Sequence, residues 1–239
     1  MMSMPPLANN HISVDCVVLG FDGIRFRVLL VKRKGEYLGR EYNDFKLPGS
    51  LIYQDEDLDE AALRVLSELI GVKDVPLKQF KAFGSKNRTR NERDVVWLER
   101  AQSVHVERIV TIAYLAIVKL DSAKLRVASR GDAIWQPVDE VGLLAFDHNI
   151  IVKEALKALR AEVSTNKAIV FDLLPRKFTA LQLRQLTELI NGRPIDVRNF
   201  HKKISQMPYV VPLDERQQGV AHRAARYYKF DRKVYNSIR

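Results

Sequence analysis

The feature that most constrains the fold is a pair of helix signals within residues 179–207. Thr179 stands three residues before Gln182, which is the spacing of a capping box at the start of a helix. An Asn-Gly pair at 191–192 ends that helix, and Asp196 can cap a second helix that runs to the end of the segment. Two helices joined by a short glycine-containing turn predict a helix-turn-helix motif.

Two short strands follow this motif. Residues 209–213 (YVVPL) and 226–230 (RYYKF) are rich in aromatic and β-branched side chains, and the polar stretch DERQQG lies between them. A hairpin placed behind a helix-turn-helix forms a wing. The end of the chain is therefore predicted to be a winged helix-turn-helix domain.

Charge is concentrated in the same part of the chain. Residues 161–239 carry 15 lysine and arginine residues against 7 acidic ones, so they account for +8 of the net charge of +10. Such a concentration is expected where a domain meets a polyanion.

The second helix of the motif has two different sides. Val197, Phe200, Ile204 and Met207 recur at helical spacing and are predicted to face the core. The opposite side carries Arg198, Asn199, Lys202, Ser205 and Gln206. Arginine and lysine can hydrogen-bond guanine, and asparagine and glutamine can hydrogen-bond adenine. Phosphate contacts are predicted for Arg176, Lys177, Arg223, Arg226 and Lys229.

A basic amphipathic helix can also be an ordinary solvated surface helix. Here the cap, the turn, the following hairpin and the charge concentration together favour double-stranded DNA as the partner. RNA is disfavoured because the sequence lacks an aromatic-rich sheet motif that would stack unpaired bases.

The first part of the chain reads as strands and helices around a core. Residues 14–21 and 25–33 form two β-branched runs joined at Asp22-Gly23, which favours a tight hairpin. Residues 108–118 are apolar enough for a central strand. A helix is predicted from apolar residues at Leu58, Ala61, Ala62, Val65, Leu66, Leu69 and Ile70, closed by Gly71.

Residues 84–104 are polar at first and then mixed, which predicts a surface loop with a short element. A further helix over residues 150–163 is expected to pack through Ile150, Ala155, Leu159 and Val163. STNK, at 164–167, is the best linker candidate. We therefore expect two domains, 1–165 and 166–239.

Composition excludes several kinds of protein. The single cysteine, Cys16, rules out a disulfide framework and a cysteine metal site, and it is expected to be a small buried core residue. No apolar run approaches the length of a membrane span, and no secretory leader pattern stands at the start. A cytoplasmic location is expected.

The stretch GSLIYQDEDLDEAALRVLSELIGV, at 49–72, resembles the Nudix box, G-x5-E-x7-R-E-U-x-E-E-x-G-U, in which U is a bulky aliphatic residue. In that family the box helix gathers carboxylates that bind divalent cations on a nucleoside diphosphate. The resemblance implies a Nudix α/β/α sandwich with a mixed sheet, and an α+β fold for the whole chain.

The box departs from the family pattern at its carboxylates. With Arg64 aligned, Val65 replaces the first glutamate and Leu69 replaces the last, so that only Glu68 is kept. The loop from Gly49 to Glu56 is one residue longer than in the family, and Ser50 replaces the usual second glycine. We expect no enzyme, or a very weak ADP-ribose pyrophosphatase, with Glu56 and Glu68 as weak metal candidates and no required cofactor.

The surrounding motifs LPGS, VLLVKR, TIAYLAIV and LAFDH stand in Nudix order, and the FTxxQL...RNFxxKI pattern follows them. Together they resemble the NAD-responsive Nudix-related transcriptional regulators, the NrtR-like family. That resemblance implies a homodimeric repressor of NAD synthesis or salvage genes, which binds operator DNA and responds to ADP-ribose or a related nucleotide.

The same resemblance assigns an effector pocket. Its candidate residues are Arg33, Lys46, Gly49, Ser50, Glu68, Phe83 and Arg108. Basic members would meet the pyrophosphate, and Phe83 would lie against the adenine.

Two alternatives stay open at this point. One is an active Nudix hydrolase of ADP-ribose-like substrates. The other is a regulator of the same architecture that responds to a sugar such as arabinose.

Overall fold

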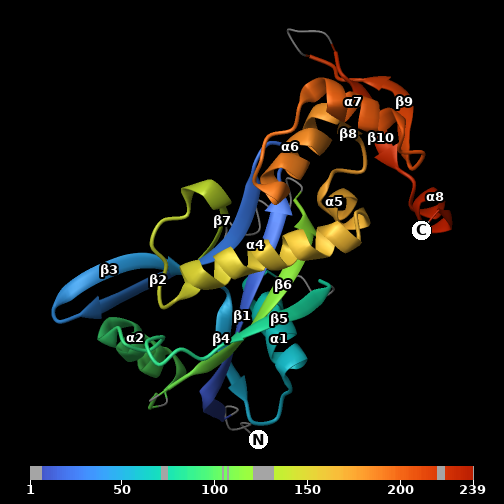
Figure 1. The fold of residues 1–239 in the computed structure, drawn as a ribbon. Coiled ribbons are helices and arrows are strands. Elements are labelled where there is room, and N and C mark those ends of the chain that lie inside the picture. The colour runs from blue at the N-terminus through green and yellow to red at the C-terminus, as the bar shows by residue number, and fades with distance from the viewer. Residues whose placement is uncertain are drawn as a thin grey trace, which may run out of the picture. The chain divides into compact units, whose positions relative to one another are not determined.

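The computed structural model describes residues 7–70, 75–103, 105–106, 108–120, 132–219 and 224–238 (Figure 1). They divide into two compact units, the first holding most residues before Leu156 and the second holding Leu156 and all later residues, with two short earlier pieces. Each unit is described by itself. No helix in the described part of the chain is long and apolar enough to cross a membrane.

The first unit is built on a seven-stranded sheet. Its strands are β1 (Ala8–Phe21), β2 (Phe26–Tyr37), β3 (Arg40–Lys46), β4 (Gly49–Tyr53), β5 (Leu77–Phe83), β6 (Val110–Lys119) and β7 (Ala133–Pro137). The order is β3-β2-β1-β6-β5, with β4 paired to β1 and β7 to β2. The predicted central strand is confirmed as β6, which lies between β1 and β5.

The predicted hairpin is also confirmed. The backbone N–H of Asp22 donates to the carbonyl of Arg25 at 3.2 Å, and Gly23 has a φ of +98°, a conformation that glycine adopts without strain. β1 is buried without interruption over residues 14–21, and β2 is buried along most of its first half. A strand that is apolar on both sides needs cover on both faces of the sheet.

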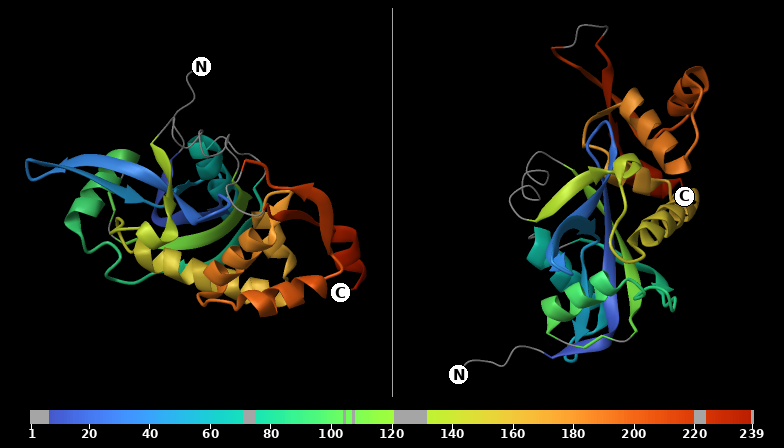
Figure 2. Two further views of the ribbon diagram at one scale, coloured as in Figure 1. Left: turned by 90° about the horizontal axis from the view of Figure 1, so that it is seen from above. Right: turned by 90° about the vertical axis from the view of Figure 1, so that its left-hand side faces the viewer.

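Helices supply that cover. They are α1 (Leu58–Ile70), α2 (Glu92–Gln102), the 3-10 helix η1 (Val138–Glu140) and α4 (His148–Thr165). α1 and the first half of α4 lie on opposite sides of the sheet (Figure 2). The helix predicted from the box is confirmed, with Ala61, Ala62, Val65 and Leu66 buried. The predicted closure at Gly71 and the side chain of Leu69 lie outside what the structure describes.

The segment 84–104 contains more helix than the sequence suggested. The loop extends to Asn91, whose side chain caps α2 by accepting from the N–H of Arg93. The regular apolar period is missing because the buried face of α2 carries a carboxylate, Asp94.

Two expectations for α4 are wrong in detail. Ile150 is largely exposed, whereas the predicted Ala155 and Leu159 are buried, together with Ile151 and Val152. The first half of the expected linker is helical, because α4 continues to Thr165, whose hydroxyl donates to the carbonyl of Glu162. Only two residues then separate α4 from α5.

The second unit contains the predicted motif. Its elements are α5 (Ala168–Leu173), β8 (Phe178–Thr179), α6 (Ala180–Asn191), α7 (Val197–Ser205), β9 (Val210–Arg216), β10 (Arg226–Phe230) and α8 (Arg232–Ser237). The capping box of Thr179 and Gln182 is present, and Gly192 ends α6 with a φ of +67°. β9 and β10 pair antiparallel to form the wing.

Aromatic rings form much of the core of this unit. Phe171 and Phe230 stack with ring centroids 4.3 Å apart, and Tyr209 meets Tyr235 edge to face at 5.0 Å. These contacts fasten α5, β10 and α8 around the motif. Neither α5 nor α8 was predicted from the sequence pattern.

Candidate functional site

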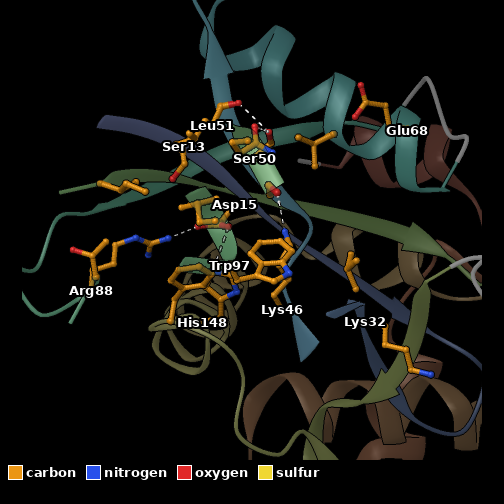
Figure 3. A pocket seen from close by; sticks show the side chains of 18 residues that line it. Ser13, Asp15, Lys32, Lys46, Ser50, Leu51, Glu68, Arg88, Trp97 and His148 are labelled. Carbon is orange, nitrogen blue, oxygen red and sulfur yellow. Dashed lines mark hydrogen bonds and ion pairs between the residues drawn. The ribbon is translucent and has the colours of Figure 1, made fainter. Parts of the chain in front are cut away.

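A cavity of about 250 Å³ opens in the first unit (Figure 3). Its wall comes from β1 and its neighbours in the sheet, from α1, from the segment before α2, from α2 itself and from the start of α4. Four predicted pocket residues line it, namely Lys46, Gly49, Ser50 and Glu68. Polar or aromatic lining residues that sequence reasoning missed are Ser13, Asp15, Lys32, Arg88, Thr89, Trp97, Gln102, Phe146 and His148.

Gly49 is required by close backbone packing at the floor of this cavity. A Cβ atom at this position would lie 2.1 Å from Oδ1 of Asp15 and 2.7 Å from the carbonyl of Val14. Both distances are far below van der Waals contact, and one of the two neighbours is backbone. Only glycine allows β4 to approach β1 here.

Asp15 is a carboxylate buried inside β1, and it is compensated on both oxygens. Oδ2 accepts from Nη2 of Arg88 at 2.6 Å, and Nε2 of His148 lies 3.4 Å from Oδ1. Arg88 also donates to Asp147 through Nη1. A buried charge requires such partners, so these residues form one electrostatic unit.

His148 is held as a neutral ring. Its Nδ1 accepts from the backbone N–H of Leu47 at 2.9 Å, which leaves the ring proton on Nε2, facing Asp15. Burial lowers the pKa of His148 to about 3. The ring therefore fixes the β3–β4 turn to the first residue of α4 without carrying charge at neutral pH.

Lys46 is the buried cation of the cavity. The residue is 8% exposed, and Nζ donates to the carbonyls of Leu47 at 3.1 Å and Gly49 at 2.8 Å. The ammonium lies 5.7 Å from the ring centroid of Trp97, and Figure 3 shows the two side chains next to each other. Burial lowers the pKa of Lys46 to about 8, against the opposing charge of Asp15.

Arg33 does not line the cavity, contrary to expectation. It is buried in an ion-pair network, donating to both oxygens of Asp44 at 2.7 Å and to Asp94 at 2.6 Å. Asp94 in turn accepts from the backbone N–H of Phe146 at 2.9 Å. Arg33 therefore positions Phe146, a cavity residue with the unusual φ of +55°.

The other two misplaced candidates also lie outside the cavity lining. Phe83 is buried in an edge-to-face contact with Phe80, with ring centroids 6.2 Å apart. Arg108 is exposed and donates to the carbonyl of Gly84 at 2.8 Å. The aromatic side chains that do line the cavity include Trp97 of α2 and Phe146.

The sequence held a partial signal for the residues that were missed. Asp15 interrupts an otherwise apolar strand, and a charge in such a place needs buried partners. The partners themselves, Arg88 and His148, lie 73 and 133 positions away along the chain. Spacing alone could not pair them with Asp15.

The helix of the Nudix box, α1, contributes few carboxylate groups to the cavity. Val65 is 2% exposed and lines the wall, while the side chain of Glu68 is 60% exposed and lies 3.7 Å from Arg64. Glu56 does not line the cavity, because both its oxygens accept from Arg64, at 2.8 and 2.6 Å. Among the described residues, no group of three or more histidine, cysteine or acidic side chains could hold a metal ion.

The second unit presents a basic helix face. On α7, Phe200 and Ile204 are buried, whereas Val197 is 49% exposed and Met207 lies beyond the helix end. The predicted base-reading residues Arg198, Asn199, Lys202, Ser205 and Gln206 are all exposed. Of the predicted phosphate contacts, Arg176, Lys177, Arg226 and Lys229 are exposed, and Arg223 lies outside the described residues.

One of these phosphate candidates already has a partner. Nζ of Lys177 lies 2.6 Å from a carboxylate oxygen of Glu215 on β9. Both side chains are exposed, so the pair is open to competition from another anion.

Comparisons with known proteins cover both units. A model of the Nudix domain matches residues 9–159, and a model of the NrtR DNA-binding winged helix domain matches residues 170–230. The ADPR responsive transcriptional repressor NtrR of Acinetobacter baylyi is 24% identical over 228 residues, which is 94% of this chain and 83% of that protein.

Solved structures match over most of the chain. Shewanella oneidensis NrtR in complex with a 27mer DNA is 25% identical and matches with a TM-score of 0.65 over 92% of this chain and 93% of that one. The structure of Shewanella oneidensis NrtR solved on its own is 26% identical, with a TM-score of 0.63 over 92% of this chain and 94% of that one. The chain therefore belongs to the Nudix family, in the NrtR-like group that joins a Nudix domain to a DNA-binding winged helix domain.

Proposed function

We propose that the protein is a transcriptional repressor that binds operator DNA through its winged helix and responds to ADP-ribose or a related NAD metabolite. One observation carries the proposal: the chain joins an exposed basic recognition helix to a ligand cavity in which Val65 fills the position of the first box glutamate. Resemblance to the NrtR-like family implies that the genes it regulates serve NAD synthesis or salvage.

DNA recognition falls to α7 and the wing. Arg198, Asn199 and Lys202 are exposed on the side of α7 away from Phe200 and Ile204, where they can enter a major groove. Arg226 and the other basic residues around the motif would contact phosphates and orient the helix. The Shewanella oneidensis relative was solved with a 27mer DNA, which supports this assignment.

The cavity is proposed as the effector site. ADP-ribose combines an adenine ring, sugars and a diphosphate, and the cavity offers groups of matching kinds. Trp97 supplies an aromatic surface for the base, in the role first assigned to Phe83, and Lys46 supplies charge for the diphosphate. The curated relative from Acinetobacter baylyi is named for its response to ADPR.

The same site is proposed to bind without hydrolysis. A ligand that survives binding can hold a conformational equilibrium, because its effect depends on its different affinity for the two states. Glu68 is the single carboxylate of the R-E and E-E pairs that this chain retains. Turnover of ADP-ribose should therefore be absent or very slow.

We assign residues 1–165 to effector binding and residues 166–239 to DNA binding. A symmetric homodimer would place two α7 helices on a palindromic site with half-sites about one or two helical turns apart.

The test begins with the full-length protein and a randomised DNA library. Selected sequences should share a palindrome, and addition of ADP-ribose should release the protein from that DNA in a fluorescence anisotropy titration. Sites without twofold symmetry would contradict the dimer, and DNA affinity that ignores ADP-ribose would contradict the effector. Parallel titrations with arabinose and with NAD test the sugar-responsive alternative, which predicts that arabinose releases the DNA. Assays for ADP-ribose turnover with magnesium test the alternative of an active hydrolase.

A further inference from the structure

The Nudix fold implies a divalent cation at its ligand site, and the residues of this cavity do not fit one. Of the described lining residues, two are carboxylates, Asp15 and Glu68. Asp15 is occupied, because Arg88 and His148 lie against its two oxygens at 2.6 and 3.4 Å. Glu68 remains as a single acidic ligand, whereas hard cations in proteins require several oxygen ligands.

The cavity is instead built for an anion. Its charged lining consists of three cationic side chains, Lys32, Lys46 and Arg88, against the two carboxylates. Of these cations, Arg88 is committed to Asp15 and Asp147. Lys46 is different, because its described hydrogen-bond partners are two neutral carbonyl groups.

Lys46 is therefore a buried charge held in place by backbone dipoles. An ammonium has three donors, and the described contacts of Lys46 use two of them. In a water-poor site, a fixed cation attracts an anion far more strongly than it does in solution. In hydrolases of the same fold, a bound metal ion supplies this attraction for the anion.

We propose that the cavity binds its nucleotide diphosphate without a divalent cation, and that the ammonium of Lys46 supplies the positive charge that a metal would otherwise supply. This inference rests on the proposed function, since it takes the effector to be a diphosphate. It deepens that function by naming the group that makes recognition independent of metal.

The test is calorimetric titration of the full-length protein with ADP-ribose, in EDTA and in magnesium. Affinity should agree within about twofold between the two conditions, because no metal takes part. Lys46→Met keeps the length of the side chain without its charge, and it should weaken binding by about 10- to 100-fold in both conditions, as expected for loss of a charge-assisted contact. Lys34→Met removes an exposed lysine of β2 that does not line the cavity, and it should bind like the wild type.

A pH series on the wild type provides a second readout that needs no variant. Burial lowers the pKa of Lys46 to about 8, so its charge is lost within an accessible range and affinity should fall as the pH rises above 8. The titratable groups that face Lys46 are Asp15 and Cys16 of β1, Arg33 of β2, Arg88, and His148 of α4. Burial raises the pKa of the Cys16 thiol above this range, and Arg33, whose pKa is raised, despite burial, by hydrogen bonds to Asp44 and Asp94, stays charged across it.

The outcomes separate this inference from the proposed function. Binding that appears only with magnesium, or Lys46→Met that binds as tightly as the wild type, overturns the inference while ADP-ribose remains the effector. If ADP-ribose binds in neither condition and leaves the DNA complex unchanged, both proposals are overturned. If Lys46→Met does not fold, the EDTA comparison and the pH series on the wild type still decide.

Discussion

The two functional regions of this protein hold their positive charges in opposite ways. In the cavity, Lys46 and Arg88 are buried, and each is held by backbone carbonyls or carboxylates within 3.1 Å. On α7, Arg198 and Lys202 are exposed, and among the described residues neither forms an ion pair.

The difference reflects the size of the partner. A small ligand gains affinity from groups that are already fixed in place, because little freedom is lost on binding. A long polyanion is recognised by mobile, hydrated cations whose counterions are released on contact. The cavity should therefore respond to changes as a folded core does, whereas α7 should respond as a binding surface does.

Lowering the pH should have the largest effect on stability, and it should act through His148 in the cavity. The folded protein keeps His148 neutral down to about pH 3, whereas the unfolded chain protonates it near 6.5. Between these values the unfolded state binds more protons, so the free energy of unfolding should fall by up to roughly 5 kcal/mol as the pH falls. Denaturant titrations at intervals from pH 7 to 3 measure it.

Two histidine variants test whether His148 causes this pH dependence of stability. His148→Gln keeps an acceptor for the N–H of Leu47 and should flatten the dependence on pH. His201→Gln, at an exposed position on α7, should keep the slope. An equal slope in both variants would remove His148 from the explanation.

Loss of Arg88 should come next. Arg88→Met leaves Asp15 buried without its cation, and breaking such a pair costs about 3–5 kcal/mol of stability. Arg90→Ala, at an exposed position in the same loop, should change stability by less than about 0.5 kcal/mol. Similar melting temperatures for the two variants would show that Asp15 does not depend on Arg88.

Substitutions on α7 should affect DNA binding and leave stability nearly unchanged. Arg198→Ala or Lys202→Ala should weaken binding to the selected palindrome by about 1–3 kcal/mol, the range for losing a base contact. Lys233→Ala, which removes an exposed lysine of α8, is the control for general loss of charge. If neither α7 variant differs from Lys233→Ala in anisotropy titrations, α7 is not the recognition helix.

The smallest effect concerns the start of α6. Thr179→Ala removes the hydroxyl that accepts from the N–H of Gln182 at 3.2 Å, and such a cap contributes about 1 kcal/mol. Thr187→Ala lies inside the same helix, where its hydroxyl donates to the carbonyl of Leu183, and it should be nearly neutral. Thermal unfolding of the two variants checks the difference; equal melting temperatures would argue against the cap.

The winged helix could be predicted from sequence because its determinants are local. The capping box at Thr179, the glycine at 192 and the cap at Asp196 each act within four residues of their own position. The concentration of positive charge in residues 161–239 then indicated DNA as the partner. The exposure of Val197 could not be foreseen, because helical spacing identifies the apolar face of a helix but not how much of that face other elements bury.

The cavity was harder to predict because its members meet only through the tertiary fold. Lys46, Gly49 and Ser50 were identified because they are close to the box in sequence. Trp97 and Arg88 lie in a segment that the sequence presented as a surface loop. Arg33 was misplaced because a strand residue next to a pocket can point into the ion network behind it.

Gly49 has a consequence for how this site can change over generations. Because any side chain there would collide with Asp15 and the backbone of β1, position 49 has almost no viable variants. The wall formed by Trp97, Leu98 and Gln102 is made of side chains on one helix, each replaceable without moving a strand. New effector preferences should therefore arise by mutation along α2, while Gly49 is inherited unchanged.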